Sequence, residues 1–197
     1  MISTACCIIA GNFRRWELVR DHILPSVVDQ GFDEVLVLGH GYAGTGYRYV
    51  PVAAVTRTTL DALMLRDVAA AATEADILVY LCDDHRLHHR FGFALGEYAK
   101  QDHWDILVPR RYTIRDDTLI PLNMGVEEGY CGGHACVVKR KVVRAIPWMS
   151  TKHGPHWDFT WSRDVQAAGF RMVAAHSSGL DIEDIEYMVN PESKPWT

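Results

Sequence analysis

The sequence predicts a three-layer α/β/α domain with a mostly parallel central sheet. Two observations support this prediction. Apolar runs of strand length alternate with segments of helical periodicity through the first ninety residues, which is the order of βαβ units. The run at residues 77–82 is apolar throughout, as expected for a strand that is buried on both faces of a parallel sheet.

The first half of the chain carries the regular part of this pattern. Residues 4–10 are an apolar run that predicts the first strand, and residues 15–29 predict the first helix. That helix has apolar side chains at helical spacing: Trp16, Val19, Ile23 and Val27. Gly31 is suited to end it, because glycine adopts the left-handed conformation that closes many helices. The other predicted elements are strands at residues 34–38, 49–55 and 77–82 and a helix at residues 60–73.

The second half is less regular. Helical periodicity predicts a helix at residues 91–100, a short one at 141–145, and one at 159–168 that Gly169 ends. Short apolar runs predict strands at residues 106–109, 135–138 and 171–175. No linker or internal repeat divides the chain, so we expect one domain.

Composition excludes several classes of protein. The 197 residues carry a net charge of -5, which gives no general attraction to nucleic acid. The five cysteines form no CxxC pair and are odd in number, which favours a reducing compartment over a disulfide framework. No apolar stretch approaches the roughly 20 residues of a bilayer span. We therefore expect a soluble cytoplasmic protein.

The most informative chemistry lies at the end of the apolar run at residues 77–82. Asp83 and Asp84 follow it directly, at the edge of the sheet where ligands bind in open α/β folds. Two adjacent carboxylates repel one another unless a cation or hydrogen-bond donors offset their charge. Mg²⁺ or Mn²⁺ suits this role, because both ions accept carboxylate oxygens and commonly bridge to a diphosphate.

Two other patterns are weaker. Residues 39–44 match GxGxxG, but the chain continues in an extended, proline-containing style and opens no helix, which argues against a dinucleotide fingerprint. His85, His88 and His89 lie beside the acidic pair, yet no second cluster with ligand spacing accompanies them, so zinc is not favoured.

The segment from residue 65 to residue 84 resembles the central part of family-2 glycosyltransferases with the GT-A fold. In that family an Arg-Asn pair opens a small-residue helix, and the apolar strand that follows ends in Asp-x-Asp or Asp-Asp. Here Arg66-Asp67 stands at the Arg-Asn position, and Cys82 stands where many members have their first aspartate. The resemblance implies that Arg66, Asp67 and Asp83 contact a nucleotide-sugar donor and that Asp84 binds Mn²⁺ or Mg²⁺.

Weaker similarities occur in family order on both sides of this segment. Asn12 and Arg14 follow the first strand, where members of the family contact the nucleotide base and ribose, and Arg14 or Arg15 would reach a phosphate. Gly133 belongs to a small-residue turn that resembles the one facing the donor sugar. His176 follows the last predicted strand and resembles the late histidine that completes the metal site.

Asp158 is the candidate general base. The helix that begins near it resembles the acceptor-side helix of the family, and an inverting transferase needs a base opposite the leaving diphosphate. An ordinary helix N-cap is an equally good interpretation of the same residue. The alternative bases are Glu127, Glu128, Asp181, Glu183 and Asp184. Trp148, Trp157 and Trp161 offer surfaces for a sugar or a base, although core packing is the default role of tryptophan.

The sequence therefore predicts an enzyme: a metal-dependent glycosyltransferase that moves a sugar from a nucleotide-diphosphate sugar to an unidentified acceptor, with inversion preferred. A nucleotidyltransferase of related fold and a non-catalytic nucleotide-sugar-binding module stay open as alternatives. The stretch at residues 11–15 is too poor in glycine to favour the first, and Cys82 in the acidic motif permits the second.

The predicted organisation is one GT-A-like catalytic domain at residues 1–190, followed by a tail at residues 191–197. Residues 1–90 would form the nucleotide-binding half and residues 91–190 the acceptor-side half. The sequence encodes no motif for the donor base, the sugar or the acceptor, and a homo-oligomer is open.

Overall fold

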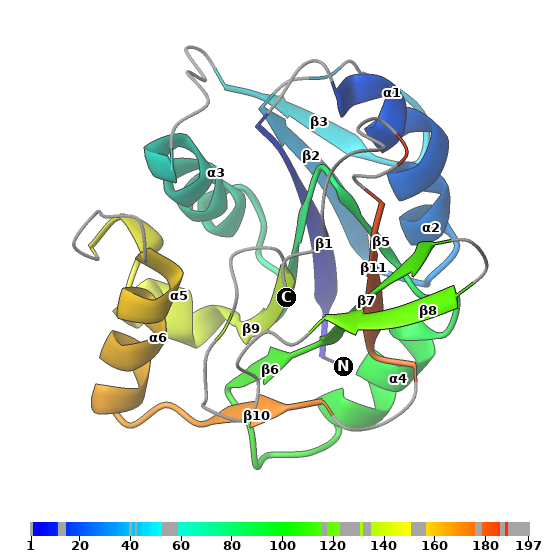
Figure 1. Ribbon diagram of the computed structural model, residues 1–197. Coiled ribbons are helices and arrows are strands. Elements are labelled where there is room, and N and C mark those ends of the chain that lie inside the picture. Colours follow the sequence, from blue (N-terminus) through cyan, green and yellow to red (C-terminus); the bar gives the residue numbers. More distant parts are fainter. Residues whose placement is uncertain are drawn as a thin grey trace.

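The computed structural model of the chain describes residues 2–11, 15–39, 41, 43–52, 59–115, 118–122, 131, 135–150, 157–175, 179–185 and 188. These residues form a seven-stranded sheet with helices on both faces and a second, four-stranded sheet at one side (Figure 1). The central sheet has the order β10-β6-β9-β4-β1-β2-β3. Its strands are β1 (Thr4–Ala10), β2 (Glu34–Gly39), β3 (Arg48–Pro51), β4 (Ile77–Cys82), β6 (Ile106–Val108), β9 (Ala135–Lys139) and β10 (Met172–Ala174).

Most neighbours in this sheet run parallel. β1 lies between β2 and β4 and pairs in parallel with both, while β9 runs antiparallel between β4 and β6. The prediction of a mostly parallel central sheet is therefore confirmed. β3 ends at Pro51, so the strand predicted at residues 49–55 was too long at Val52, and residues 53–55 lie outside the described residues.

The helices are α1 (Trp16–Leu18), η2 (Val19–Ile23), α2 (Leu24–Val28), α3 (Thr59–Ala72), α4 (Phe91–Ala99), α5 (Arg140–Ala145), η4 (Trp148–Ser150) and α6 (Trp157–Ala167). Except for η4, which was not predicted, they agree with the predicted helices to within two residues at each end. Gly31 and Gly169 follow α2 and α6 with φ of 77° and 87°, the left-handed conformation expected of a glycine that ends a helix. No helix in the described part of the chain combines the length and apolarity needed to cross a bilayer.

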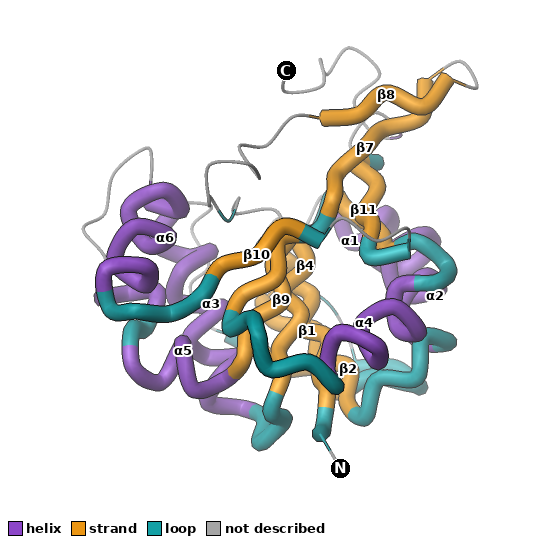
Figure 2. The backbone as a smooth tube through the Cα atoms, turned by 90° about the horizontal axis from the view of Figure 1, so that it is seen from below, coloured by secondary structure: helices purple, strands orange, loops and turns teal. Residues whose placement is uncertain are grey.

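The helices divide into two layers. Alternate side chains of β1, represented by Cys6 and Ile8, face a core shared with the α1–η2–α2 segment and α4. The others, represented by Cys7 and Ile9, face a core shared with α3, α5 and α6. Figure 2 shows the strands between these two groups of helices, so the three-layer prediction is confirmed.

The first helical segment changes its hydrogen-bonding pattern in the middle. Residues 19–23 form a π-helix between two α-helical pieces. Pro25 is the second residue of α2 and has no N–H to donate to the preceding turn. The missing donor explains why the regular α-helical hydrogen bonding is interrupted here. The buried side chains Val19, Ile23 and Val27 still face the sheet.

Sequence analysis did not predict the second sheet. Its order is β5-β11-β7-β8, with strands β5 (His85–Leu87), β7 (Arg110–Arg115), β8 (Thr118–Leu122) and β11 (Asp181–Asp184). Leu87 and Ile182 pair across β5 and β11 and join the core on the α1–α2 side. Asp83 and Asp84 form the turn between β4 of the central sheet and β5 of the second sheet. This acidic turn therefore joins the two sheets.

Asp105 ties β6 to its neighbours, and replacing it with asparagine is expected to destabilise the fold. One carboxylate oxygen lies 2.6 Å from Lys141 Nζ, and the other accepts the backbone N–H of Arg171 at 2.9 Å. Burial alone would raise the pKa of this carboxyl, but the Arg171 N–H and the Lys141 ammonium together hold it below its usual value. At pH 7 we expect Asp105→Asn to lower the free energy of unfolding by about 1–2 kcal/mol.

The sign of the pH dependence follows from the lowered pKa. A depressed carboxyl stabilises the folded state above the pKa of the unfolded chain, about 3.9, and this stabilisation is lost as the pH falls through the folded value. Urea unfolding of the wild type and of Asp105→Asn should therefore differ most at neutral pH and converge below about pH 4. Asp102→Asn, at an exposed side chain, is the control; a pH-independent difference for Asp105→Asn would contradict the ion-pair explanation.

Candidate functional site

The candidate site lies in the turn that follows β4. Asp83 and Asp84 stand at the carboxyl end of this strand, beside the end of β1, where Ile9 pairs with Cys82. The Asp83 side chain is 8% exposed and that of Asp84 14%. The pair therefore lies at the edge of the sheet, as predicted, and is largely withdrawn from solvent.

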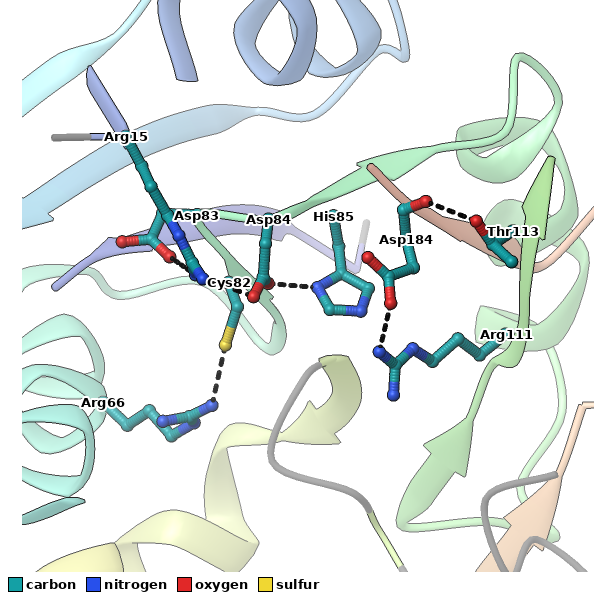
Figure 3. Close-up of polar contacts among 9 residues, drawn as sticks. All are labelled: Arg15, Arg66, Cys82, Asp83, Asp84, His85, Arg111, Thr113 and Asp184. Carbon is teal, nitrogen blue, oxygen red and sulfur yellow. Dashed lines mark hydrogen bonds and ion pairs between the residues drawn. The ribbon is translucent and has the colours of Figure 1, made fainter. Parts of the chain in front are cut away.

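One arginine binds both carboxylates (Figure 3). Arg15 Nη1 lies 2.9 Å from Asp83 Oδ1 and 2.8 Å from Asp84 Oδ2. Arg15 stands immediately before α1, so the segment after β1 supplies a cation to the segment after β4. This contact offsets the repulsion that two adjacent carboxylates would otherwise have.

Asp84 has a second partner in the next residue. His85 Nδ1 makes a short contact with Asp84 Oδ1, and the His85 side chain is fully buried. The two carboxylate oxygens of Asp84 are thus held by two different groups, Arg15 on one side and His85 on the other.

The polar cluster continues into the second sheet. His85 and Asp184 are cross-strand partners in β5 and β11, and Asp184 Oδ2 lies 2.5 Å from Arg111 Nη2. Thr113 Oγ1 donates to the backbone carbonyl of Asp184 at 3.1 Å. The backbone N–H of Ile185 donates to the carbonyl of Asp84 at 2.8 Å, which fastens the end of β11 to the acidic turn.

The charges of this cluster do not cancel. Within the described residues it contains two arginines, Arg15 and Arg111, and three aspartates, Asp83, Asp84 and Asp184, so the formal charges of these five side chains sum to one negative charge. Most of these side chains are largely buried, where the attraction between unlike charges is stronger than in water. A cation beside these five side chains would offset their remaining negative charge.

Arg66 lies on the other side of β4. Its side chain is buried, with Nη1 donating to the Ala62 carbonyl at 2.9 Å and Nη2 lying 3.5 Å from Cys82 Sγ. The guanidinium is 5.0 Å from the centre of the Trp157 ring and 5.4 Å from that of Trp148. Arg66 thus joins the end of β4 to the beginning of α6 by a cation–π contact.

Cys82 takes the place of the first acidic residue of the motif, and its chemistry differs from that of an aspartate. Burial raises the pKa of its thiol to about 12, with Asp83 and Asp84 adding to this effect against the opposing charge of Arg66. In the metal-free chain the thiol is therefore neutral near pH 7.

Asp67 has a structural function in this chain. Its two carboxylate oxygens accept the backbone N–H groups of Trp148 and Met149, both at 2.9 Å, and so hold η4 against α3. Burial raises the pKa of this carboxyl despite those hydrogen bonds. Its predicted contact with the donor stays a prediction.

Asp158 lies in the first turn of α6. Its Oδ1 accepts the N–H of Phe159 at 2.9 Å, and its carbonyl accepts the Ser162 hydroxyl at 2.7 Å. The preceding residue, Trp157, contacts Arg66, and Arg66 also contacts Cys82. The side chain of Arg66 therefore links the start of α6 to the end of β4. Trp148 and Trp161 are buried and stacked with ring centres 3.6 Å apart, which assigns both to the core.

Four of the predicted site residues, Asn12, Arg14, Gly133 and His176, lie outside the described residues. The same holds for Glu127 and Glu128, two of the alternative bases. Asp181 and Glu183, also named as alternative bases, form ion pairs with arginines of the neighbouring strands in the second sheet. Arg110 Nε lies 2.6 Å from Asp181, and Arg86 Nε lies 2.8 Å from Glu183.

A large cavity of about 980 Å³ lies between the second sheet and the η2–α2 segment. The two ion pairs, Tyr112 and His88 contribute to its lining, whereas Asp83 and Asp84 do not. It is therefore distinct from the acidic turn.

Comparison with known proteins places the fold. No family model matches the sequence, and no curated protein matches it either. Residues 1–349 of TarS from S. aureus superpose with a TM-score of 0.67 at 9% identity, covering 94% of this chain and 61% of that one. The same protein in complex with UDP-GlcNAc gives 0.67 at 9% identity, over 92% and 58%. The mannosyltransferase PcManGT from Pyrobaculum calidifontis, in complex with GDP-Man and Mn²⁺, gives 0.65 at 10% identity, over 94% and 57%.

The chain has a GT-A-like glycosyltransferase fold. At such low identity the similarity establishes the fold alone, and this GT-A-like chain spans about three fifths of the length of the structures it matches. The sequence-based prediction of the fold is confirmed.

Proposed function

We propose that this chain transfers a sugar from a nucleotide-diphosphate sugar to an acceptor, with the acidic turn Asp83-Asp84 as the donor site. The observation that supports this most directly is the position of the two carboxylates at the carboxyl end of β4, in a GT-A-like sheet. That edge is where open α/β sheets bind their ligands. Two structural neighbours are complexes with UDP-GlcNAc and with GDP-Man, which supports a donor of this class.

A divalent cation fits the donor site in charge and in ligand type. Arg15, Arg111 and the three aspartates, the charged side chains of the cluster that the structure describes, sum to one negative charge, and carboxylate oxygens are ligands that Mg²⁺ and Mn²⁺ accept. Within the described residues no three His, Cys, Asp or Glu side chains converge on one point, so the ligands would be Asp84, Asp83 and groups beyond that part, with His176 as the candidate. When bound, the ion would offset the charge that grows on the leaving diphosphate.

Three residues of the chain would have separate roles in binding and catalysis. Asp83 would orient the donor. Arg66 would hold the end of β4 against α6 and so fix the position of the donor side relative to the acceptor side. Asp158, at the start of α6, is our candidate for the base that removes the proton from the acceptor hydroxyl, with inversion at the sugar carbon.

Calorimetric titration with UDP-GlcNAc, GDP-Man and the corresponding nucleoside diphosphates, with and without Mn²⁺, tests this proposal. We expect one nucleotide to bind with a dissociation constant between about 1 μM and 1 mM, as is usual for enzyme substrates, and its sugar conjugate to be slowly hydrolysed. Binding without hydrolysis or transfer would favour the non-catalytic module. No nucleotide binding with either metal condition would contradict the donor site altogether.

A further inference from the structure

The contact between Arg15 and the acidic turn affects how a divalent ion and the donor would bind to the proposed donor site. A single nitrogen, Arg15 Nη1, bridges Asp83 Oδ1 and Asp84 Oδ2, and the three side chains are 22%, 8% and 14% exposed. Charge-assisted bonds of this kind are among the stronger polar contacts in proteins. The arginine is therefore a substantial part of what stabilises two adjacent carboxylates in the ligand-free protein.

A divalent ion and this arginine need the same oxygen. Asp84 Oδ1 is held by His85 Nδ1, and His85 is completely buried, so that contact is fixed by packing. The oxygen opposite, Oδ2, is the one that Arg15 binds. An ion that coordinates Asp84 Oδ2 would bring a second positive charge to the oxygen that Arg15 already binds, and the repulsion between the two cations favours displacement of the guanidinium.

We propose that Arg15 is a resident cation of the Asp83-Asp84 pair, which a divalent ion displaces when the donor binds, and that the displaced guanidinium then binds an oxygen of the donor diphosphate. This inference rests on the proposed function, because it assumes that a diphosphate arrives with the ion. Arginine suits the exchange, since its planar fork binds carboxylate and phosphate oxygens equally well and its long side chain moves between them by rotamer changes alone.

The exchange makes the metal and the donor cooperative. An ion that arrives alone leaves the displaced guanidinium without an anionic partner, whereas an ion that arrives with a diphosphate gives it a new one. Coupling between two ligands is reciprocal, so each should raise the affinity for the other by the same factor. The site would then bind its ion weakly until the donor is present.

Electron paramagnetic resonance of Mn²⁺ alone, titrated with protein, tests the competition directly. We expect Arg15→Gln to bind Mn²⁺ about tenfold more tightly than the wild type, because the competing cation is gone. Arg15→Lys keeps the charge and should bind as weakly as the wild type. Arg20→Gln is the matched control: it makes the same change of net charge a few residues further on, at a side chain that is 54% exposed and paired only locally with Asp21 in the described structure.

A second measurement tests the cooperativity. With saturating UDP or GDP, whichever binds in the donor titration, and after correction for the Mn²⁺–nucleotide complex in solution, the gain in Mn²⁺ affinity should be about tenfold larger in the wild type than in Arg15→Gln. Circular dichroism melts confirm that the variants are folded.

Each outcome either supports or overturns the proposed exchange of Arg15 for a divalent ion. Tighter Mn²⁺ binding by Arg15→Gln, with Arg20→Gln unchanged, supports the exchange. Equal binding by the wild type and Arg15→Gln, or weaker binding by Arg15→Gln, would overturn it, even if nucleotide binding stands. Absence of Mn²⁺ binding by every protein, with or without nucleotide, would also overturn it, and the donor titration without metal would then decide the proposed function separately.

Discussion

Replacing Asp84 with asparagine is expected to slow glycosyl transfer by about 10²- to 10³-fold, the loss typical of removing one electrostatic contact to a transition state. Asparagine has nearly the same shape but no charge. The change would therefore remove the attraction for Arg15 at 2.8 Å, weaken the contact with His85, and leave the cluster without its excess negative charge. The decrease should appear in kcat as well as in kcat/KM, because the charge on the leaving diphosphate grows in the transition state.

The measurement is initial-rate kinetics of donor hydrolysis or transfer, with the nucleotide sugar identified by calorimetry. Asp102→Asn is the matched control, since it makes the same chemical change at a fully exposed side chain and should leave the rate unchanged. A rate for Asp84→Asn within about threefold of the wild type would show that this carboxylate has no part in the chemistry, whatever the fold suggests.

Truncating Trp148 to alanine is expected to lower the free energy of unfolding by about 3–5 kcal/mol, the usual cost of removing a buried tryptophan. Trp148 is fully buried in the core between α3, α5 and α6. It stacks on Trp161 at 3.6 Å between ring centres and meets the edge of Tyr80 at 5.8 Å.

Urea unfolding of wild-type protein and of Trp148→Ala measures this loss, and Phe93→Ala is the control. Phe93 is 68% exposed on α4, so its truncation should change stability by less than about 0.5 kcal/mol. A loss below about 1 kcal/mol for Trp148→Ala would mean that the aromatic cluster is loosely packed. Because Arg66 lies 5.4 Å from this ring, we also expect the variant to weaken donor binding.

The central sheet could be predicted from sequence because its signals are local. The run Ile77–Cys82 is apolar at every position, and the strand it predicts lies at the centre of the sheet between β1 and β9. The helix ends at Gly31 and Gly169 were predictable for the same reason, since left-handed glycine is a property of one residue.

The second sheet could not be predicted because its strands depend on distant partners. β11 reads Asp-Ile-Glu-Asp, which by itself indicates an exposed acidic loop. It is a buried strand because Arg86, Arg110 and Arg111 lie across from its carboxylates on neighbouring strands. Propensity is a weak guide where cross-strand pairs supply the stability.

The candidate site was predictable in position but not in its contacts. The sequence indicates that Asp83 and Asp84 end a buried strand, and they do. It gives no indication that Arg15 spans both carboxylates, because that contact joins residues 68 and 69 positions apart. Asp67 was predicted to contact the donor because of its place in the motif, but its observed contacts are structural. It accepts the backbone N–H groups of η4.

The antiparallel strand β9 has a consequence for how proteins of this architecture can diversify. Ala135 pairs with Leu81, so β9 begins at the same edge of the sheet at which β4 ends in Asp83. Substitutions at Ala135 would therefore act beside the acidic turn, while the pairing of β9 with β4 and β6 keeps the strands in register. Evolution can thus alter substrate preference at this point of the chain without redesigning the folding core.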